Sequence, residues 1–173
     1  MHPIVITCYA LSSGVNVKEI KYGAIPTIYR GIQFRSRLEA KIACFLDSYD
    51  LIWDFEPLDL KRYIPDFIVE FPWGATLVEA KPAVRPAEFK PACRKITRSG
   101  WTGPALVIGS QLALGPDDRA DLTMFGSTQA EDGCWSRVGR ERWPADWGSE
   151  YVFPDCFTKW VEAGNVTRWD PGQ

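Results

Sequence analysis

The sequence predicts an α/β domain, a mixed-sheet sandwich with helices on both faces. Two observations carry this prediction. Periodic apolar residues and turn residues give the order helix, three strands, helix, strand along residues 35–109. The second helix lies where a crossover is needed before a further strand, whereas the first three strands follow one another as a meander. A chain of 173 residues suits one such domain with an appendage.

The first elements lie before the core strands. Residues 3–10 and 25–34 read as short strands that pair in a leading hairpin. A helix is predicted over 35–47, because apolar residues recur along one stripe: Leu38, Ile42, Phe45, Leu46 and Tyr49. Ser36 is a natural N-cap residue, and Glu39 three positions later completes a capping box. Capping is therefore one sufficient explanation for the acid at Glu39.

The core elements are bounded by turn residues. Residues 51–56 alternate between apolar and polar and predict the first core strand. The apolar runs 67–71 and 75–80 flank a Pro-Trp-Gly break and predict a hairpin. Residues 87–99 predict a basic helix, and the compact apolar run 105–109 predicts a further strand.

Beyond this strand the pattern weakens. A short helix is predicted over 117–125, and residues 126–150 read as an irregular loop or cover. A final helix is predicted over 154–163, with Gly164 and Asn165 as its stop signal.

These patterns divide the chain into two parts. Residues 1–110 are predicted to form the core with its leading hairpin, and residues 111–173 a C-terminal extension packed on that core. The extension is rich in tryptophan: Trp135, Trp143, Trp147, Trp160 and Trp169. We expect these rings to pack the extension against the core rather than to stack on nucleic-acid bases.

Composition excludes several classes of protein. The 46% hydrophobic content supports a packed core, and no run approaches the roughly 20 apolar residues of a membrane span. No leader segment is apparent, so a cytoplasmic protein without a membrane partner is expected. The five cysteines form no Cys-x-x-Cys pair, and His2 is the single histidine, which argues against zinc knuckles and His-based catalysis. Acid–base or metal chemistry must therefore use carboxylates and lysine.

Charge is distributed unevenly along the chain. The formal net charge is −2, yet residues 81–98 contain six cations and one acid. A local basic patch is what phosphate binding requires, and the net charge does not forbid it. The alternative is a solvated helix face whose counter-charges lie elsewhere.

Three charged residues interrupt the apolar runs of the predicted hairpin. Asp66 follows Pro65, and Glu79 and Lys81 lie two residues apart, so both point to the same side of their strand. Charge in apolar strands is costly without a partner. An even hairpin loop, such as 71–74, places Asp66 opposite Glu79 on one face, whereas an odd loop separates them. We predict the even register.

The combination of these residues resembles the PD-(D/E)xK nuclease superfamily. The motif is Pro65-Asp66 followed by Glu79-Ala80-Lys81, preceded by a helix that carries Glu39. Longer strings resemble TnsA-type transposon endonucleases, the junction-resolving endonucleases of T-odd bacteriophages and related small phage nucleases: Phe34-Arg35-Ser36-Arg37-Leu38-Glu39-Ala40, Trp53-x-Phe55-Glu56-Pro57 and Tyr63-x-Pro65-Asp66-Phe67. The resemblance covers residues 22–110 and implies a restriction-endonuclease-like fold.

The resemblance implies a Mg²⁺-dependent DNA endonuclease related to a phage or mobile element, with Mn²⁺ as a substitute metal. Asp66 and Glu79 offer the hard oxygen ligands that Mg²⁺ prefers, together with the Ala80 carbonyl, and Glu39 would hold a second metal or a water. Lys81 would orient or deprotonate the attacking water. Phosphate contacts are expected from neighbouring cations: Arg35, Arg37, Lys90, Arg94 and Lys95.

Two other interpretations remain open at this point. The chain could be a non-catalytic DNA-binding or assembly subunit of the same fold. Alternatively, Glu39 is only a helix cap, and Glu79 with Lys81 is only an ion pair on a strand. The sequence does not separate endonuclease from exonuclease or DNA from RNA, and it identifies neither a homodimer interface nor protein partners in a phage or transposition complex.

Overall fold

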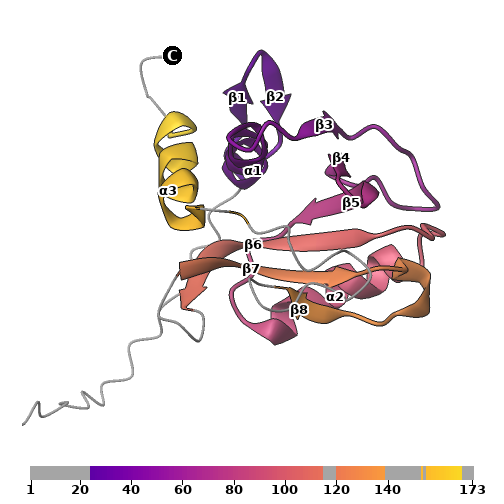
Figure 1. Ribbon diagram of the computed structural model, residues 1–173. Coiled ribbons are helices and arrows are strands. Elements are labelled where there is room, and N and C mark those ends of the chain that lie inside the picture. Colours follow the sequence, from indigo (N-terminus) through magenta and orange to yellow (C-terminus); the bar gives the residue numbers. More distant parts are fainter. Residues whose placement is uncertain (1–23, 115–119, 139–152, 154, 169–173) are drawn as a thin grey trace, which may run out of the picture.

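A six-stranded mixed sheet forms the centre of the molecule (Figure 1). The computed structural model describes residues 24–114, 120–138, 153 and 155–168. In spatial order the strands are β3 (Ile52–Phe55), β4 (Phe67–Phe71), β5 (Gly74–Ala80), β6 (Ala105–Leu114), β7 (Ala120–Ser127) and β8 (Ser136–Val138). Among these six, β5 and β6 pair in parallel and all other neighbours pair antiparallel. The predicted mixed sheet and its three-stranded meander are confirmed.

Helices cover both faces of this sheet, as predicted (Figure 1). α1 (Arg37–Asp47) and α3 (Cys156–Val166) lie on one face, and α2 (Pro86–Thr97) lies on the other. Alternate strand residues divide between the two cores: Val78 packs in the core of α1 and α3, and Leu77 packs in that of α2. None of the helices in the described ranges is long and apolar enough to cross a membrane.

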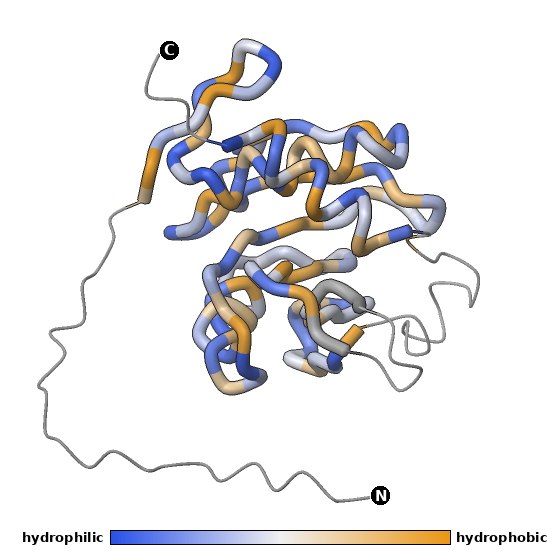
Figure 2. Tube along the Cα trace, turned by 90° about the vertical axis from the view of Figure 1, so that its left-hand side faces the viewer, coloured by the Kyte–Doolittle hydropathy of each residue, from blue (hydrophilic) through white to orange (hydrophobic). Residues whose placement is uncertain are grey.

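α1 begins as its sequence predicts. The Ser36 hydroxyl accepts the Glu39 N–H at 3.2 Å, and the Glu39 carboxylate accepts the Ser36 N–H at 3.3 Å. The capping box is therefore complete. The apolar stripe buries Ile42, Phe45 and Leu46, and Figure 2 shows the resulting alternation of hydrophobic and hydrophilic residues along the helices.

The leading hairpin differs from the prediction. Its strands are β1 (Thr27–Tyr29) and β2 (Ile32–Phe34), which pair antiparallel within the segment expected to form one strand. Arg30 and Gly31 form the turn with φ values of 49° and 77°, a backbone twist that suits two-residue hairpins. Residues 3–10, the predicted partner strand, lie outside the described residues.

The helix predicted over 117–125 is wrong in its described part. Residues 120–127 form β7, which pairs with β6 on one side and β8 on the other. Thr123 and Met124 are both buried, so the strand is covered on both faces and shows no simple alternation. Pairing with the neighbouring strands β6 and β8 therefore decides the conformation of a segment whose own pattern is ambiguous.

The sheet continues past the boundary placed at residue 110. β6 crosses that position and ends at Leu114 instead of Gly109, and β7 and β8 extend the same sheet. Within the segment 126–150, expected to be irregular, β7 is followed by the short 3₁₀ helix η1 (Ala130–Asp132) and by β8. The remainder of that segment, from 139 onward, is outside the described part.

α3 does not stop at Gly164 and Asn165 but continues to Val166. Gly164 instead allows close packing, because a Cβ there would lie 3.1 Å from the Lys41 Nζ of α1. That Nζ lies 3.9 Å from the Trp160 ring centroid. Trp160 is buried, and Trp135 packs against the α2 core, so these two rings pack as expected. The other three tryptophans named above are not among the described residues.

Candidate active site

The β4–β5 hairpin has the predicted even register. Its ladder runs from the pair Phe71 and Gly74 to the pair Phe67 and Val78. The next step of the same register brings Asp66 opposite Glu79. Asp66 Oδ2 accepts the N–H of Ala80 at 2.7 Å, which fixes the carboxylate beside β5. Both acids are buried, with 4% and 3% of their surfaces exposed. The two carboxylates are therefore gathered at one end of the hairpin.

Glu79 is held by two donors. Tyr63 donates its hydroxyl to Glu79 Oε2 at 2.5 Å, and Lys81 Nζ lies 2.5 Å from Glu79 Oε1. Lys81 points to the same side of the strand as Glu79, as alternation predicts. The Lys81 side chain is 35% exposed, whereas that of Glu79 is 3% exposed. The ammonium group therefore lies between a buried carboxylate and solvent. An ammonium at this position is available to a ligand.

Asp66 faces an arginine that the sequence assigned to phosphate. Arg35 donates from a terminal nitrogen to Asp66 Oδ1 at 2.7 Å, and its Nε lies 2.8 Å from Glu56 Oε1. The same Nε lies 4.0 Å from Glu39 Oε2. Arg35 therefore acts as a shared counter-ion for three carboxylates.

Glu39 approaches the site from α1 but is occupied by helix capping. Its Oε2 accepts the backbone N–H groups of Arg35 at 3.0 Å and Ser36 at 3.3 Å. The capping interpretation of Glu39 is thus confirmed. Its charge still acts on Asp66, as the weakest of the influences described next. The structure brings Asp66, Glu79 and Lys81 together and leaves Glu39 at the edge of the group.

Burial and the negative charge of Glu79 raise the pKa of the Asp66 carboxyl from 3.8 to about 7, and Glu39 adds to this effect. The Ala80 N–H and Lys81 act in the opposite direction. Arg35 is 56% exposed, so solvent screens its charge. Burial, Glu79 and Asp66 also raise the pKa of Tyr63, which stays a hydrogen-bond donor. At neutral pH, Asp66 is thus poised between its two protonation states.

The donor set fits a hard divalent cation. Two buried carboxylates and the Ala80 carbonyl supply oxygen ligands and leave coordination positions for water, as Mg²⁺ prefers. Burial and the Glu79 charge raise the pKa of Asp66 although Arg35 and Lys81 lie nearby, and a bound divalent cation would favour the ionised carboxylate. Among the described residues there is no group of three or more His, Cys, Asp or Glu side chains that could hold a metal. The fit to a divalent cation therefore rests on Asp66, Glu79 and a backbone oxygen, and Glu39 is not part of this set of ligands.

The other cations expected to bind phosphate lie in different places. Arg37 donates to the Gly164 carbonyl at 3.4 Å and so packs against α3, on the far face of the sheet from α2. Lys90, Arg94 and Lys95 are exposed on α2. Lys95 Nζ lies 4.7 Å from the centroid of the Tyr63 ring, so it borders the site.

Tyr63, Arg35 and Glu56 hold the site together, a role that was not predicted for them from the sequence. Tyr63 carried a usable signal: a tyrosine buried in a core needs a partner for its hydroxyl, and Glu79 is a buried acceptor. Arg35 and Glu56 carried none, because both are partly exposed residues of ordinary loops.

Comparisons with protein-family models, with curated proteins and with solved structures find no match for this chain. Its function must therefore be argued from the chemistry of the site.

Proposed function

We propose that the chain is a metal-dependent DNA endonuclease of the PD-(D/E)xK type, with a restriction-endonuclease-like fold, and that it hydrolyses phosphodiester bonds. One observation carries the proposal: the hairpin register gathers Asp66 and Glu79, both buried, beside the exposed ammonium of Lys81. Phosphodiester hydrolysis needs an activated water and positive charge near the phosphate. The two carboxylates would bind a metal that activates the water, and the Lys81 ammonium provides positive charge.

Each residue has a distinct task in this mechanism. Asp66, Glu79 and the Ala80 carbonyl would hold Mg²⁺ or Mn²⁺, which supplies positive charge to the phosphate and lowers the pKa of water. Lys81 donates a hydrogen bond to the attacking water or to a phosphate oxygen and stabilises negative charge as the bond to the leaving group breaks. Tyr63 fixes the orientation of Glu79, and Arg35 fixes that of Asp66.

A second candidate function is supported by the ion pairs of the site. Arg35 and Lys81 already neutralise Asp66 and Glu79, as they would in a non-catalytic DNA-binding or assembly subunit. The two candidates differ in whether a divalent cation engages these carboxylates.

A plasmid-nicking assay tests the proposal. Supercoiled plasmid should be converted to nicked or linear DNA in Mg²⁺ or Mn²⁺ and should stay supercoiled in EDTA. The Asp66→Asn variant keeps the size and hydrogen-bonding shape of the side chain but removes its charge, so it should be inactive in the same buffer. Binding of DNA without any cleavage, under all metal conditions, would favour the non-catalytic subunit.

Tyr63→Phe should lower the nicking rate by about 10-fold, because Glu79 loses the donor that orients it. Stability should fall by about 1–3 kcal/mol, the usual cost of leaving a buried acceptor short of a partner. Tyr29→Phe is a matched control, since Tyr29 also donates to a carboxylate, that of Asp47 at 2.8 Å, away from the site. The Tyr29→Phe variant should be less stable than the wild type but should nick plasmid at the wild-type rate. Equal nicking in both variants would remove Tyr63 from the mechanism.

A further inference from the structure

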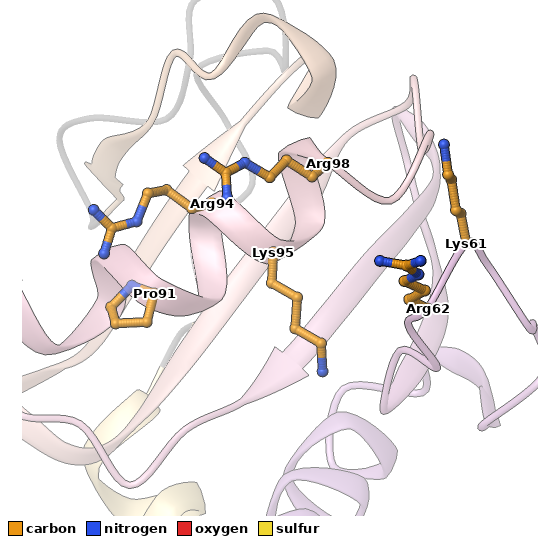
Figure 3. A pocket seen from close by; sticks show the side chains of 6 residues that line it. All are labelled: Lys61, Arg62, Pro91, Arg94, Lys95 and Arg98. Carbon is orange, nitrogen blue, oxygen red and sulfur yellow. The ribbon is translucent and has the colours of Figure 1, made fainter.

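A basic pocket lies between α2 and the turn that precedes Asp66 (Figure 3). Its volume is about 450 Å³, and it is lined by Lys61, Arg62, Pro91, Arg94, Lys95 and Arg98. Five of these six residues are cations. Within the part of the chain that the structure describes, none of the ion pairs involves any of the five. The pocket therefore concentrates positive charge, and no carboxylate of the described residues forms an ion pair with it.

The turn presents two of these cations at its tip. Leu60 and Tyr63 exchange both backbone hydrogen bonds, at 2.8 and 3.0 Å, and leave Lys61 and Arg62 between them. Arg62 has a φ of 57°, in the left-handed region that glycine adopts readily and other residues rarely do. A cation is thus kept at a position where glycine would fold more easily. Arg62→Gly would therefore remove the charge without straining this turn.

The opposite wall is the exposed face of a regular helix. Arg94 and Lys95 project from the last turn of α2 and Arg98 is its C-cap residue, so the packed helix fixes the spacing of all three. Like charges held this close repel one another, and an anion in the pocket would relieve that repulsion. Arginine side chains in particular can form paired hydrogen bonds to phosphate oxygens.

One side chain connects this pocket to the active site. Lys95 Nζ lies 4.7 Å from the Tyr63 ring centroid, and the hydroxyl of the same ring donates to Glu79. A ligand bound in the pocket is therefore separated from the carboxylates by a single tyrosine.

We propose that this pocket binds the phosphates of the DNA strand that enters the site, without reading its bases. The inference rests on the proposed function in taking DNA as the ligand, and it adds Lys61, Arg62 and Arg98 to the cations expected from sequence. Lysine and arginine contacts to phosphate position a strand but carry no sequence information. Affinity should therefore be similar for unrelated sequences and should fall steeply with salt.

Arg62→Gly is the sharpest test, because glycine fits the left-handed backbone and keeps the fold. Binding would be measured by fluorescence anisotropy in EDTA, with two unrelated labelled duplexes of about 20 base pairs between about 50 and 200 mM KCl. We expect affinity about 3- to 10-fold weaker for both duplexes, a salt slope smaller by about one, and an unchanged or higher melting temperature. Arg94→Ala combined with Arg98→Ala should weaken binding further, by about 10- to 100-fold.

Arg30→Gly is the matched control. Arg30 is another exposed arginine at a turn, with a φ of 49°, but it lies in the β1–β2 hairpin beside α1. Its removal should leave affinity and salt slope unchanged.

Wild-type affinity and salt slope in both the Arg62 variant and the double variant would overturn the pocket assignment, even if the protein nicks plasmid. A loss confined to one of the two duplexes would also overturn it, since that would mean base reading. Loss of binding to both duplexes in a protein that never nicks would support the pocket and reject the nuclease.

Discussion

Replacing Lys81 by alanine is expected to lower the rate of plasmid nicking by about 100-fold or more, the usual effect of removing a catalytic donor or proton-transfer group. Lys81 places its ammonium 2.5 Å from Glu79 Oε1 while 35% of its side chain remains exposed. Its ammonium group can thus contact both the Glu79 carboxylate and a substrate. Because its removal leaves the buried Glu79 carboxylate without this counter-ion, the melting temperature of the variant is measured beside its nicking rate.

Lys81→Arg separates two roles for this group. Arginine keeps the positive charge but is not deprotonated in proteins, and its planar fork differs in shape from an ammonium group. Nicking restored close to the wild-type rate would assign Lys81 to charge stabilisation, whereas a rate still at least about 10-fold low would assign it to proton transfer or to precise placement of water.

Lys159→Ala is the control for both Lys81 variants. Lys159 is partly exposed on α3, and its Nζ lies 3.8 Å from the centroid of the Tyr49 ring, on the far face of the sheet from α2. The Lys159→Ala variant should nick plasmid at the wild-type rate. If Lys81→Ala does so as well, Lys81 has no part in the reaction and the proposed site is wrong.

The sequence predicted the core fold well where local patterns were sufficient. The capping box of α1 and the Pro-Trp-Gly break between β4 and β5 depend on residues a few positions apart, and both occur as predicted. β7 was mistaken for a helix because it is covered on both faces and shows no simple alternation, so its conformation depends on pairing with β6 and β8. The β1–β2 turn was missed because Arg30 takes a left-handed backbone conformation that its residue type disfavours.

The residues of the candidate site also fall into two groups: those that local patterns predict and those that depend on the three-dimensional fold. Asp66, Glu79 and Lys81 lie on one hairpin, so strand alternation and loop length were enough to bring them together. Arg35 was expected to bind phosphate, but it pairs with Asp66, which is 31 residues away in sequence. Arg37, only two residues further, packs against α3. Their roles depend on how the start of α1 is oriented against the rest of the fold, which the local sequence does not encode.

Divalent metal should raise the melting temperature of the wild-type protein, and Asp66→Ala should abolish that gain. A ligand at about 100 times its dissociation constant stabilises by about 2.7 kcal/mol, or about 5 to 10 °C for a domain of this size. Asp66→Asn should lose the response as well, because an amide cannot supply the anionic oxygen. Asp54→Asn is the control, since Asp54 is exposed on β3, and it should respond like the wild type.

The same carboxyl sets the pH dependence of the metal-free protein. The pKa of Asp66 is raised from 3.8 in the unfolded chain to about 7 in the fold, so the folded state keeps a proton that the unfolded state has lost. This contribution to stability is fully present below the unfolded pKa and disappears as pH rises through the folded value. At about 1.4 kcal/mol per unit, the loss amounts to at most about 4 kcal/mol. Urea unfolding in EDTA should therefore show a steeper decline between pH 5 and 8 for the wild type than for Asp66→Asn.

Metal and proton compete for this carboxylate, so the two effects are linked. The gain in melting temperature from Mg²⁺ or Mn²⁺ should be larger at pH 8 than at pH 6, because the metal binds the ionised form. A gain that persists unchanged in Asp66→Ala would place the metal elsewhere. If the wild type showed no gain at either pH, Arg35 and Lys81 would be permanent counter-ions of Asp66 and Glu79, and the non-catalytic DNA-binding subunit would be the better account of this site.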